Sequence, residues 1–123
     1  MPAYVDGFVV PVPTDKLDAY RKMARKAGKI WIEYGALQYR ECVADDVKPG
    51  KLTSFPQAVK LKEGETVVFS WIVYNSRRER DKINAKVMSD PRLADMMDPK
   101  NMPNMPFDTK RMFFGGFKTI VEL

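Results

Sequence analysis

Apolar and polar positions follow two different spacings along the chain, and together they predict four strands and two helices. Alternating or continuous runs of aromatic and β-branched residues are typical of strands, whereas apolar positions three and four apart are typical of amphipathic helices. The order is strand, helix, strand, strand, helix, strand. The predicted strands are 4–12, 35–43, 66–74 and 111–121, and the predicted helices are 15–27 and 77–89.

Each predicted helix has one apolar stripe and recognisable end signals. We expect Thr14 to cap the first helix and Gly28 to end it. Ser76 and Glu79 form a capping box for the second helix. The stripes consist of Leu17, Tyr20, Ala24 and Ala27 in the first helix and Ile83, Val87 and Met88 in the second.

This order of elements predicts an α+β fold of the ferredoxin-like βαββαβ type, with a four-stranded antiparallel sheet. Two right-handed crossovers place both helices on one face of such a sheet, so the other face stays uncovered. Because the strands at 4–12, 66–74 and 111–121 are apolar on both sides, that face is too apolar to remain in water. A second copy of the chain is the simplest cover, and pairing would give a dimeric α/β barrel with a cavity between the sheets. The alternative is a monomer whose long connection, residues 44–65, folds over the open face.

Three local features stand apart from the regular pattern. Glu41 interrupts the alternation of the strand at 35–43. Within the long connection, residues 54–59 suggest either a helical turn or a short edge strand. Between residues 98 and 108 the chain is rich in Pro and Met, and the side chains of Met102, Met105 and Phe107 suggest a lid over a cavity or a clamp on a partner.

Composition fits one globular domain spanning residues 1–123. At 14.1 kDa, with 45% hydrophobic and 30% charged residues, the chain is too apolar for disorder. Cys42 is the single cysteine, which suits a reducing compartment. No segment approaches the roughly 18 apolar residues of a membrane span, and the N-terminus lacks the pattern of a secretory signal. We therefore expect a cytoplasmic protein that does not enter a membrane.

The net charge of +5 raises the question of a nucleic-acid partner. Basic residues gather in two stretches, 22–29 and 77–86, largely on the predicted helices. No base-reading module accompanies them, so solvated helix faces explain the charge more simply. Binding of RNA or another polyanion through these faces is an alternative function, less favoured than a small-molecule ligand.

The chain contains no histidine, and this removes several chemistries. A Ser-His triad, a histidine-ligated haem and histidine-based zinc or iron sites are all excluded. One cysteine cannot build a thiolate metal site. Gly115 and Gly116 lie in a strand-like run, where a bulge or close packing is more typical than a phosphate cradle. We expect neither a metal nor a cofactor.

Polar residues on the predicted strands supply a candidate pocket. A carboxylate among apolar walls can act as a base when burial raises its pKa. Structural roles are the alternative: turn amides for Asp6, pairing of Glu41 or Asp108 with Arg111, and core packing for Trp71 and Cys42. The candidate residues are Asp6, Glu41, Cys42, Ser70, Trp71, Asp108 and Arg111.

Several spaced motifs resemble the YbaA-like bacterial proteins, a family of unknown function. They are Tyr4-Val5-Asp6-Gly7-Phe8, Glu41-Cys42 with Asp45-Asp46-Val47, Phe69-Ser70-Trp71, Ser89-Asp90-Pro91-Arg92, Met105-Pro106-Phe107-Asp108, Lys110-Arg111-Met112 and Gly115-Gly116-Phe117. The resemblance implies a dimeric α/β barrel of ferredoxin-like halves, similar in fold to small monooxygenases and stress-response proteins. It supplies no activity and no catalytic residues.

These observations lead to one hypothesis of function and two alternatives. We expect a homodimer that binds a small, partly apolar molecule between its sheets, with or without cofactor-independent chemistry. The alternatives are the polyanion-binding dimer and an interaction module without a ligand.

Overall fold

The computed structural model describes residues 2–123, without the side chains of residues 102–104. Met102 of the predicted lid or clamp therefore lies outside the described side chains. The strands are β1 (Tyr4–Pro13), β2 (Gln38–Val43), β3 (Glu65–Tyr74) and β4 (Phe113–Lys118). The α-helices are α1 (Leu17–Glu33), α2 (Phe55–Ala58), α3 (Arg77–Met88) and α4 (Pro91–Met96), and the 3-10 turns are η1 (Thr14–Lys16), η2 (Pro99–Asn104) and η3 (Thr109–Arg111).

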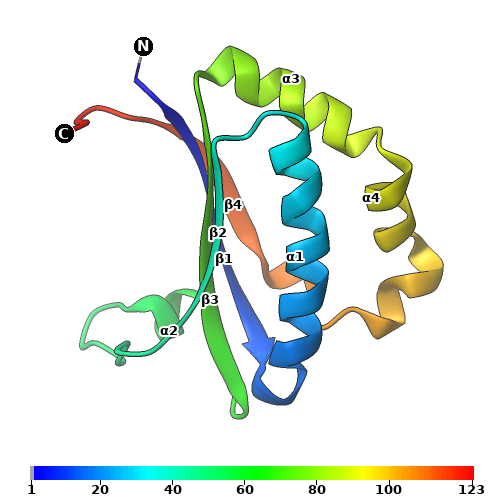
Figure 1. Ribbon diagram of the computed structural model, residues 1–123. Coiled ribbons are helices and arrows are strands. Elements are labelled where there is room, and N and C mark those ends of the chain that lie inside the picture. Colours follow the sequence, from blue (N-terminus) through cyan, green and yellow to red (C-terminus); the bar gives the residue numbers. More distant parts are fainter. Residues whose placement is uncertain (1) are drawn as a thin grey trace.

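The four strands form one antiparallel sheet in the order β2-β3-β1-β4, as the predicted topology requires. In the register of the central strand, Asp6 of β1 lies opposite Ile72 of β3 on one side and Gly116 of β4 on the other. Figure 1 shows α1 and α3 together on one face of the sheet, with α4 beyond them. The predicted α+β architecture with two covering helices is confirmed.

The core lies between this face of the sheet and the helices, in two clusters. Near the start of α1, Tyr20 and Ala24 pack with Val10, Val12 and Val68 of the sheet. The second cluster lies under α3 and the end of α1, and it consists of Ile30, Ala36, Ile72, Tyr74, Ile83, Val87 and Leu93. The helical stripes predicted from the sequence supply several of these side chains.

The prediction that Gly28 ends the first helix is wrong, because α1 continues to Glu33. Gly28 is buried, and a Cβ atom there would lie 2.6 Å from Cδ1 of Tyr39. Its role is therefore a close approach of the helix to β2. The chain leaves the helix at Gly35, whose φ of +116° favours glycine.

The other differences from the predicted bounds are at element ends. The predicted Thr14 cap is wrong, because Thr14 begins the turn η1 and α1 begins at Leu17 without a side-chain cap, and β2 begins at Gln38 in place of residue 35. Of the two alternatives for residues 54–59, the structure has the helical turn, α2, which Ser54 caps by accepting a hydrogen bond from the Gln57 amide. β4 is shorter than the predicted strand at 111–121, because Arg111 belongs to η3 and the chain leaves the sheet after Lys118.

The open face of the sheet is aromatic. Since Asp6 contacts α3, alternation places its neighbours Val5 and Gly7 on the opposite face. The loop of residues 44–64 lies on this side and covers only one end, where the Phe55 and Phe69 ring centroids are 5.9 Å apart. Three phenylalanines on the open face of the sheet remain substantially exposed: Phe69 at 41%, Phe113 at 46% and Phe117 at 64%.

Candidate functional site

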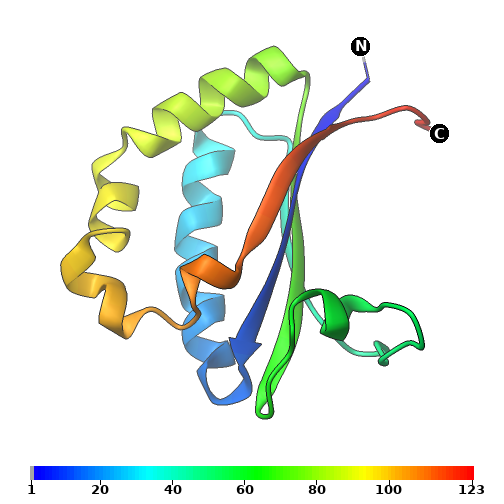
Figure 2. The same ribbon diagram turned by 180° about the vertical axis from the view of Figure 1, so that it is seen from behind.

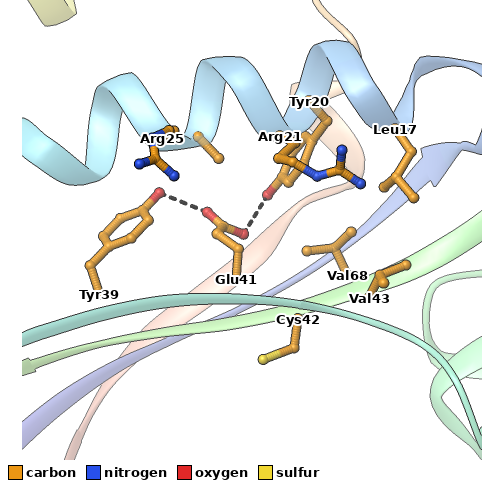
Figure 3. A pocket seen from close by; sticks show the side chains of 10 residues that line it. Leu17, Tyr20, Arg21, Arg25, Tyr39, Glu41, Cys42, Val43 and Val68 are labelled. Carbon is orange, nitrogen blue, oxygen red and sulfur yellow. Dashed lines mark hydrogen bonds between the residues drawn. The ribbon is translucent and has the colours of Figure 1, made fainter.

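A groove of about 270 Å³ opens between α1 and the edge strand β2 (Figure 3). α1 supplies one wall at three- and four-residue spacing, and β2 and β3 supply the other. It is lined by Leu17, Tyr20, Arg21, Ala24, Arg25, Tyr39, Glu41, Cys42, Val43 and Val68.

Glu41 occupies the middle of this groove and is held from both sides. One carboxylate oxygen accepts a hydrogen bond from the Tyr20 hydroxyl at 2.8 Å, and the other accepts one from the Tyr39 hydroxyl at 2.7 Å. Glu41 and Tyr39 are two residues apart on β2, so both side chains leave the same face of the strand toward α1. The residue that interrupts the apolar alternation is thus the polar centre of the groove.

Both tyrosine hydroxyls stay protonated and act as hydrogen-bond donors. Burial, reinforced by the neighbouring Glu41 carboxylate, raises the pKa of Tyr20 and of Tyr39 far above the ordinary tyrosine value. Each hydroxyl therefore donates to Glu41 throughout the physiological pH range. A carboxylate oxygen has lone pairs for more than one donor, so Glu41 can accept a further hydrogen bond from a molecule in the groove.

The rest of the groove combines apolar walls with a basic rim. Leu17, Val43 and Val68 offer hydrocarbon surface. At the rim, Arg21 pairs with Asp18 at 2.9 Å, whereas Arg25 makes no salt bridge among the described residues. This arrangement suits a small molecule with an apolar body and a polar end.

Asp6, the first candidate from the sequence, lies outside the groove. It is 4% exposed and accepts hydrogen bonds from Nε and Nη2 of Arg80 at 2.9–3.1 Å. The Arg80 guanidinium also lies 5.3 Å from the centre of the Tyr4 ring. A Cβ atom on Gly116 would come within 2.6 Å of Arg80 Nη2, so this glycine gives close packing beside the ion pair. Asp6 joins β1 to α3.

Ser70, Trp71 and Cys42 are divided between the two faces of the sheet. Ser70 is buried on the helix side. Trp71 lies on the open face, where its indole N–H donates to Gln38 Oε1 at 2.7 Å and the Arg40 guanidinium lies 5.9 Å from its ring centre. Cys42 borders the groove, but its side chain points away from it (Figure 3).

Arg111 belongs to the turn η3, and Asp108 immediately precedes it. Asp108 caps it by accepting a hydrogen bond from the Lys110 amide at 2.9 Å. Arg111 pairs with Glu65 and donates to the backbone carbonyl of Val59 at 3.1 Å. Hydrogen bonding to Arg111 lowers the pKa of Glu65 below its ordinary value. The pairing partner of Arg111 is thus Glu65, in place of Glu41 or Asp108.

The seven candidates are therefore not brought together in one pocket, and Glu41 is the one whose side chain enters the groove. The tyrosines beside it were missed because Tyr20 fits the apolar stripe of a helix and Tyr39 fits the alternation of a strand. The available signal was Glu41 itself, a charged residue at a position that faces the core. A cavity between two sheets requires a second copy and stays a prediction.

The basic stretches lie on the outer faces of α1 and α3, partly neutralised by acidic neighbours. Ion pairs join Lys22 to Asp18 at 3.4 Å and Lys82 to Glu79 at 3.8 Å. Polyanion binding stays a prediction, and these ion pairs disfavour it because they neutralise part of the positive charge.

Within residues 2–123 no helix is long and apolar enough to cross a membrane, and the side chains described there form no cluster of three Cys, Asp or Glu suited to a metal ion.

Comparison with known proteins places this geometry in a family. A solved structure, a dimeric ferredoxin-like protein from an uncultured marine organism, matches all of both chains with a TM-score of 0.62 and 11% identity, which confirms the fold. The "Uncharacterized protein YbaA" of Escherichia coli K12 is 55% identical over 119 residues, 97% of each chain, and the protein of that name in Shigella flexneri matches equally. The family model described as "Protein of unknown function (DUF1428)" matches residues 3–109. The chain therefore belongs to the DUF1428 family, as its resemblance to the YbaA-like proteins indicated.

Proposed function

We propose that this protein is a cytoplasmic homodimer that binds a small, partly apolar molecule in the groove between α1 and β2. The observation that supports the site is the Glu41 carboxylate, held by two tyrosine hydroxyls within apolar walls. The carboxylate keeps lone pairs beyond those used by the two tyrosines, and a ligand with a hydroxyl or amino group could donate a hydrogen bond to them.

The proposed ligand has two chemical features. Its apolar body lies against Leu17, Val43 and Val68, and its hydroxyl or amino group donates a hydrogen bond to Glu41. Glu41 is half-buried, and a ligand without a donor would displace water from its carboxylate without replacing the hydrogen bond, so the groove should discriminate against such a ligand. The groove should therefore prefer a hydroxylated or aminated molecule over its hydrocarbon counterpart.

The proposed homodimer rests on the open face of the sheet. Phe69, Phe113 and Phe117 lie exposed on it, and an apolar face of this size is unusual for a monomer. A second copy is the occupant we propose because an identical sheet offers the same aromatic surface, and two sheets pack about 10 Å apart by interdigitating such side chains. The matching solved structure is itself described as dimeric.

Phenol and toluene provide a matched pair of probes for the ligand proposal, since they differ in the hydroxyl group. We would record amide chemical shifts of the ¹⁵N-labelled protein during titration with each. The expected result is saturable shifts at residues 17–25 and 39–43, with phenol binding more tightly by at least about tenfold, the value of one hydrogen bond to a charged group.

Glu41→Gln is the informative variant, and Glu63→Gln is its matched control on an exposed hairpin away from the groove. In Glu41→Gln the preference for phenol should fall sharply, whereas Glu63→Gln should keep it. Equal binding of the two probes to the unmodified protein, or shifts confined to other surfaces, would exclude the groove as the site.

A further inference from the structure

We infer that in the homodimer the C-terminal segment, residues 119–123, of each copy lies against the α2 loop, residues 44–64, of its partner. The inference rests on the homodimer proposed above and specifies how the two copies are oriented. It follows from the position, exposure and bulk of these two segments.

Both segments project from the same side of the sheet, at its opposite ends. In Figures 1 and 2 the α2 loop leaves one end of the sheet on the side away from α1 and α3. The C-terminal segment continues β4 and bends toward that same side at the other end. The open face is therefore bounded by a projection at each end.

The two segments expose apolar side chains that their own chain leaves uncovered. On the α2 loop, Leu52 is 95% exposed and Phe55 is 47% exposed. On the C-terminal segment, Ile120 is 86% exposed and Val121 is 71% exposed. The described hydrogen bonds of the segment to its own chain run from Thr119 to the Ala3 carbonyl, and none involves a residue after it.

The area required for a stable dimer also involves these segments. A face of four strands, two of ten residues and two of six, measures about 19 Å across and roughly 20–33 Å along the strands, or about 500 Å² in plan, whereas a standard interface buries about 800 Å² from each partner. The flat sheet alone falls short of that value. Contacts from the α2 loop and the C-terminal segment can supply the difference.

A two-fold axis between the facing sheets can run along the strands, across them or obliquely between these directions. An axis parallel to the strands sets like ends together, so two bulky α2 loops meet at one end and two thin C-terminal segments at the other. The two sheets would then lie farther apart at the end with the two loops than at the other end.

The α2 loop lies over β3 near one edge of the sheet, whereas the C-terminal segment continues β4 at the other edge. An axis that runs obliquely across the strands therefore sets each loop opposite the partner's segment at both ends, which keeps the spacing near the value of about 10 Å found in packed sheets. We therefore assign this oblique orientation.

Thiol cross-linking distinguishes these orientations. In a Cys42→Ala background, Leu52→Cys and Val121→Cys would be made as separate single-cysteine chains with tags of different mass, then co-expressed and treated with a short bismaleimide at low micromolar concentration. The expected product is a covalent dimer containing one chain of each tag. Either chain expressed alone should give no covalent dimer, and a Lys29→Cys chain, exposed on the outer face of α1, serves as the negative control.

Sedimentation of the same samples separates the failure of this inference from the failure of the homodimer. A monomeric protein would overturn the proposed dimer and the inference with it. A dimer in which Leu52→Cys or Val121→Cys cross-links to itself, or in which the mixed pair gives no product, would overturn the orientation alone.

Discussion

Tyr39 and Gly28 meet so closely that the ring of one occupies the space where the other would have a side chain. A Cβ atom at Gly28 would lie 2.6 Å from Cδ1 of the ring. Gly28→Ala should therefore destabilise the protein by about 1–3 kcal/mol, the usual effect of overpacking, although alanine favours a helix by about 1 kcal/mol over glycine. Urea unfolding monitored by circular dichroism measures the change.

Two further variants separate the clash from a general intolerance of helix substitutions. Lys29→Ala, at the exposed neighbouring position, should alter the free energy of unfolding by less than about 0.5 kcal/mol. In a Tyr39→Leu background, Gly28→Ala should lose most of its effect because the ring is gone. An unchanged effect in that background would refute the close-approach role of Gly28.

The buried ion pair between Asp6 and Arg80 should be costly to break. Asp6→Asn removes the buried partner of the Arg80 guanidinium and leaves it with Asp81 at 3.0 Å, so the loss should lie at the lower end of the range of about 3–5 kcal/mol that breaking a buried pair costs. The exposed pair of Asp18 with Arg21 is the comparison, since Asp18→Asn should cost no more than about 1 kcal/mol. Similar effects of the two substitutions, measured by urea unfolding, would contradict the structural role assigned to Asp6.

The tyrosines of the groove predict a loss of stability in alkali. Their pKa values are raised in the folded chain, so their contribution is complete below the ordinary tyrosine pKa of about 10. Above that pH the unfolded chain loses phenolic protons that the folded chain retains. Each such tyrosine makes the free energy of unfolding fall by about 1.4 kcal/mol per pH unit.

Tyr39→Phe isolates one of these protons. Between pH 10 and pH 11.5, a range set by the ordinary tyrosine pKa of about 10, its free energy of unfolding should fall less steeply than that of the unmodified protein by about 1.4 kcal/mol per pH unit. Phenolate absorbance of the folded protein provides an independent reading. Parallel slopes for the two proteins would show that Tyr39 titrates normally and that Glu41 lacks the proton donor described here.

Most of the fold could be predicted because hydrophobic spacing reports directly on burial. The run of aromatic and β-branched residues in β1 and the capping box at Ser76 are local features, and local physical chemistry decides them. Gly28 misled the prediction because glycine ends helices in general, whereas here it admits a ring from a strand that follows in the sequence. Only tertiary contact distinguishes these two uses.

The site was harder to predict because its residues each have an ordinary alternative. Glu41 could be selected because a charge at a core-facing strand position needs a partner, but its partners, Tyr20 and Tyr39, are typical core residues. Asp6 pairs with Arg80 of α3 and Trp71 lies on the open face of the sheet, so neither shares the groove of Glu41. The sequence does not show which face of the sheet each of these side chains occupies or which element it contacts. Arg111 shows the same limit, because its partner Glu65 is 46 residues away.

Sedimentation velocity at micromolar concentration tests most directly whether the open sheet face is an interface between two copies. The unmodified protein should sediment at twice the 14.1 kDa chain mass, and Phe69→Glu, which adds a charge to the exposed aromatic face, should sediment as a single chain with an unchanged circular dichroism spectrum. Leu37→Glu, an exposed substitution outside the open face, should remain a dimer. An unmodified protein that sediments as one 14.1 kDa chain would contradict the account.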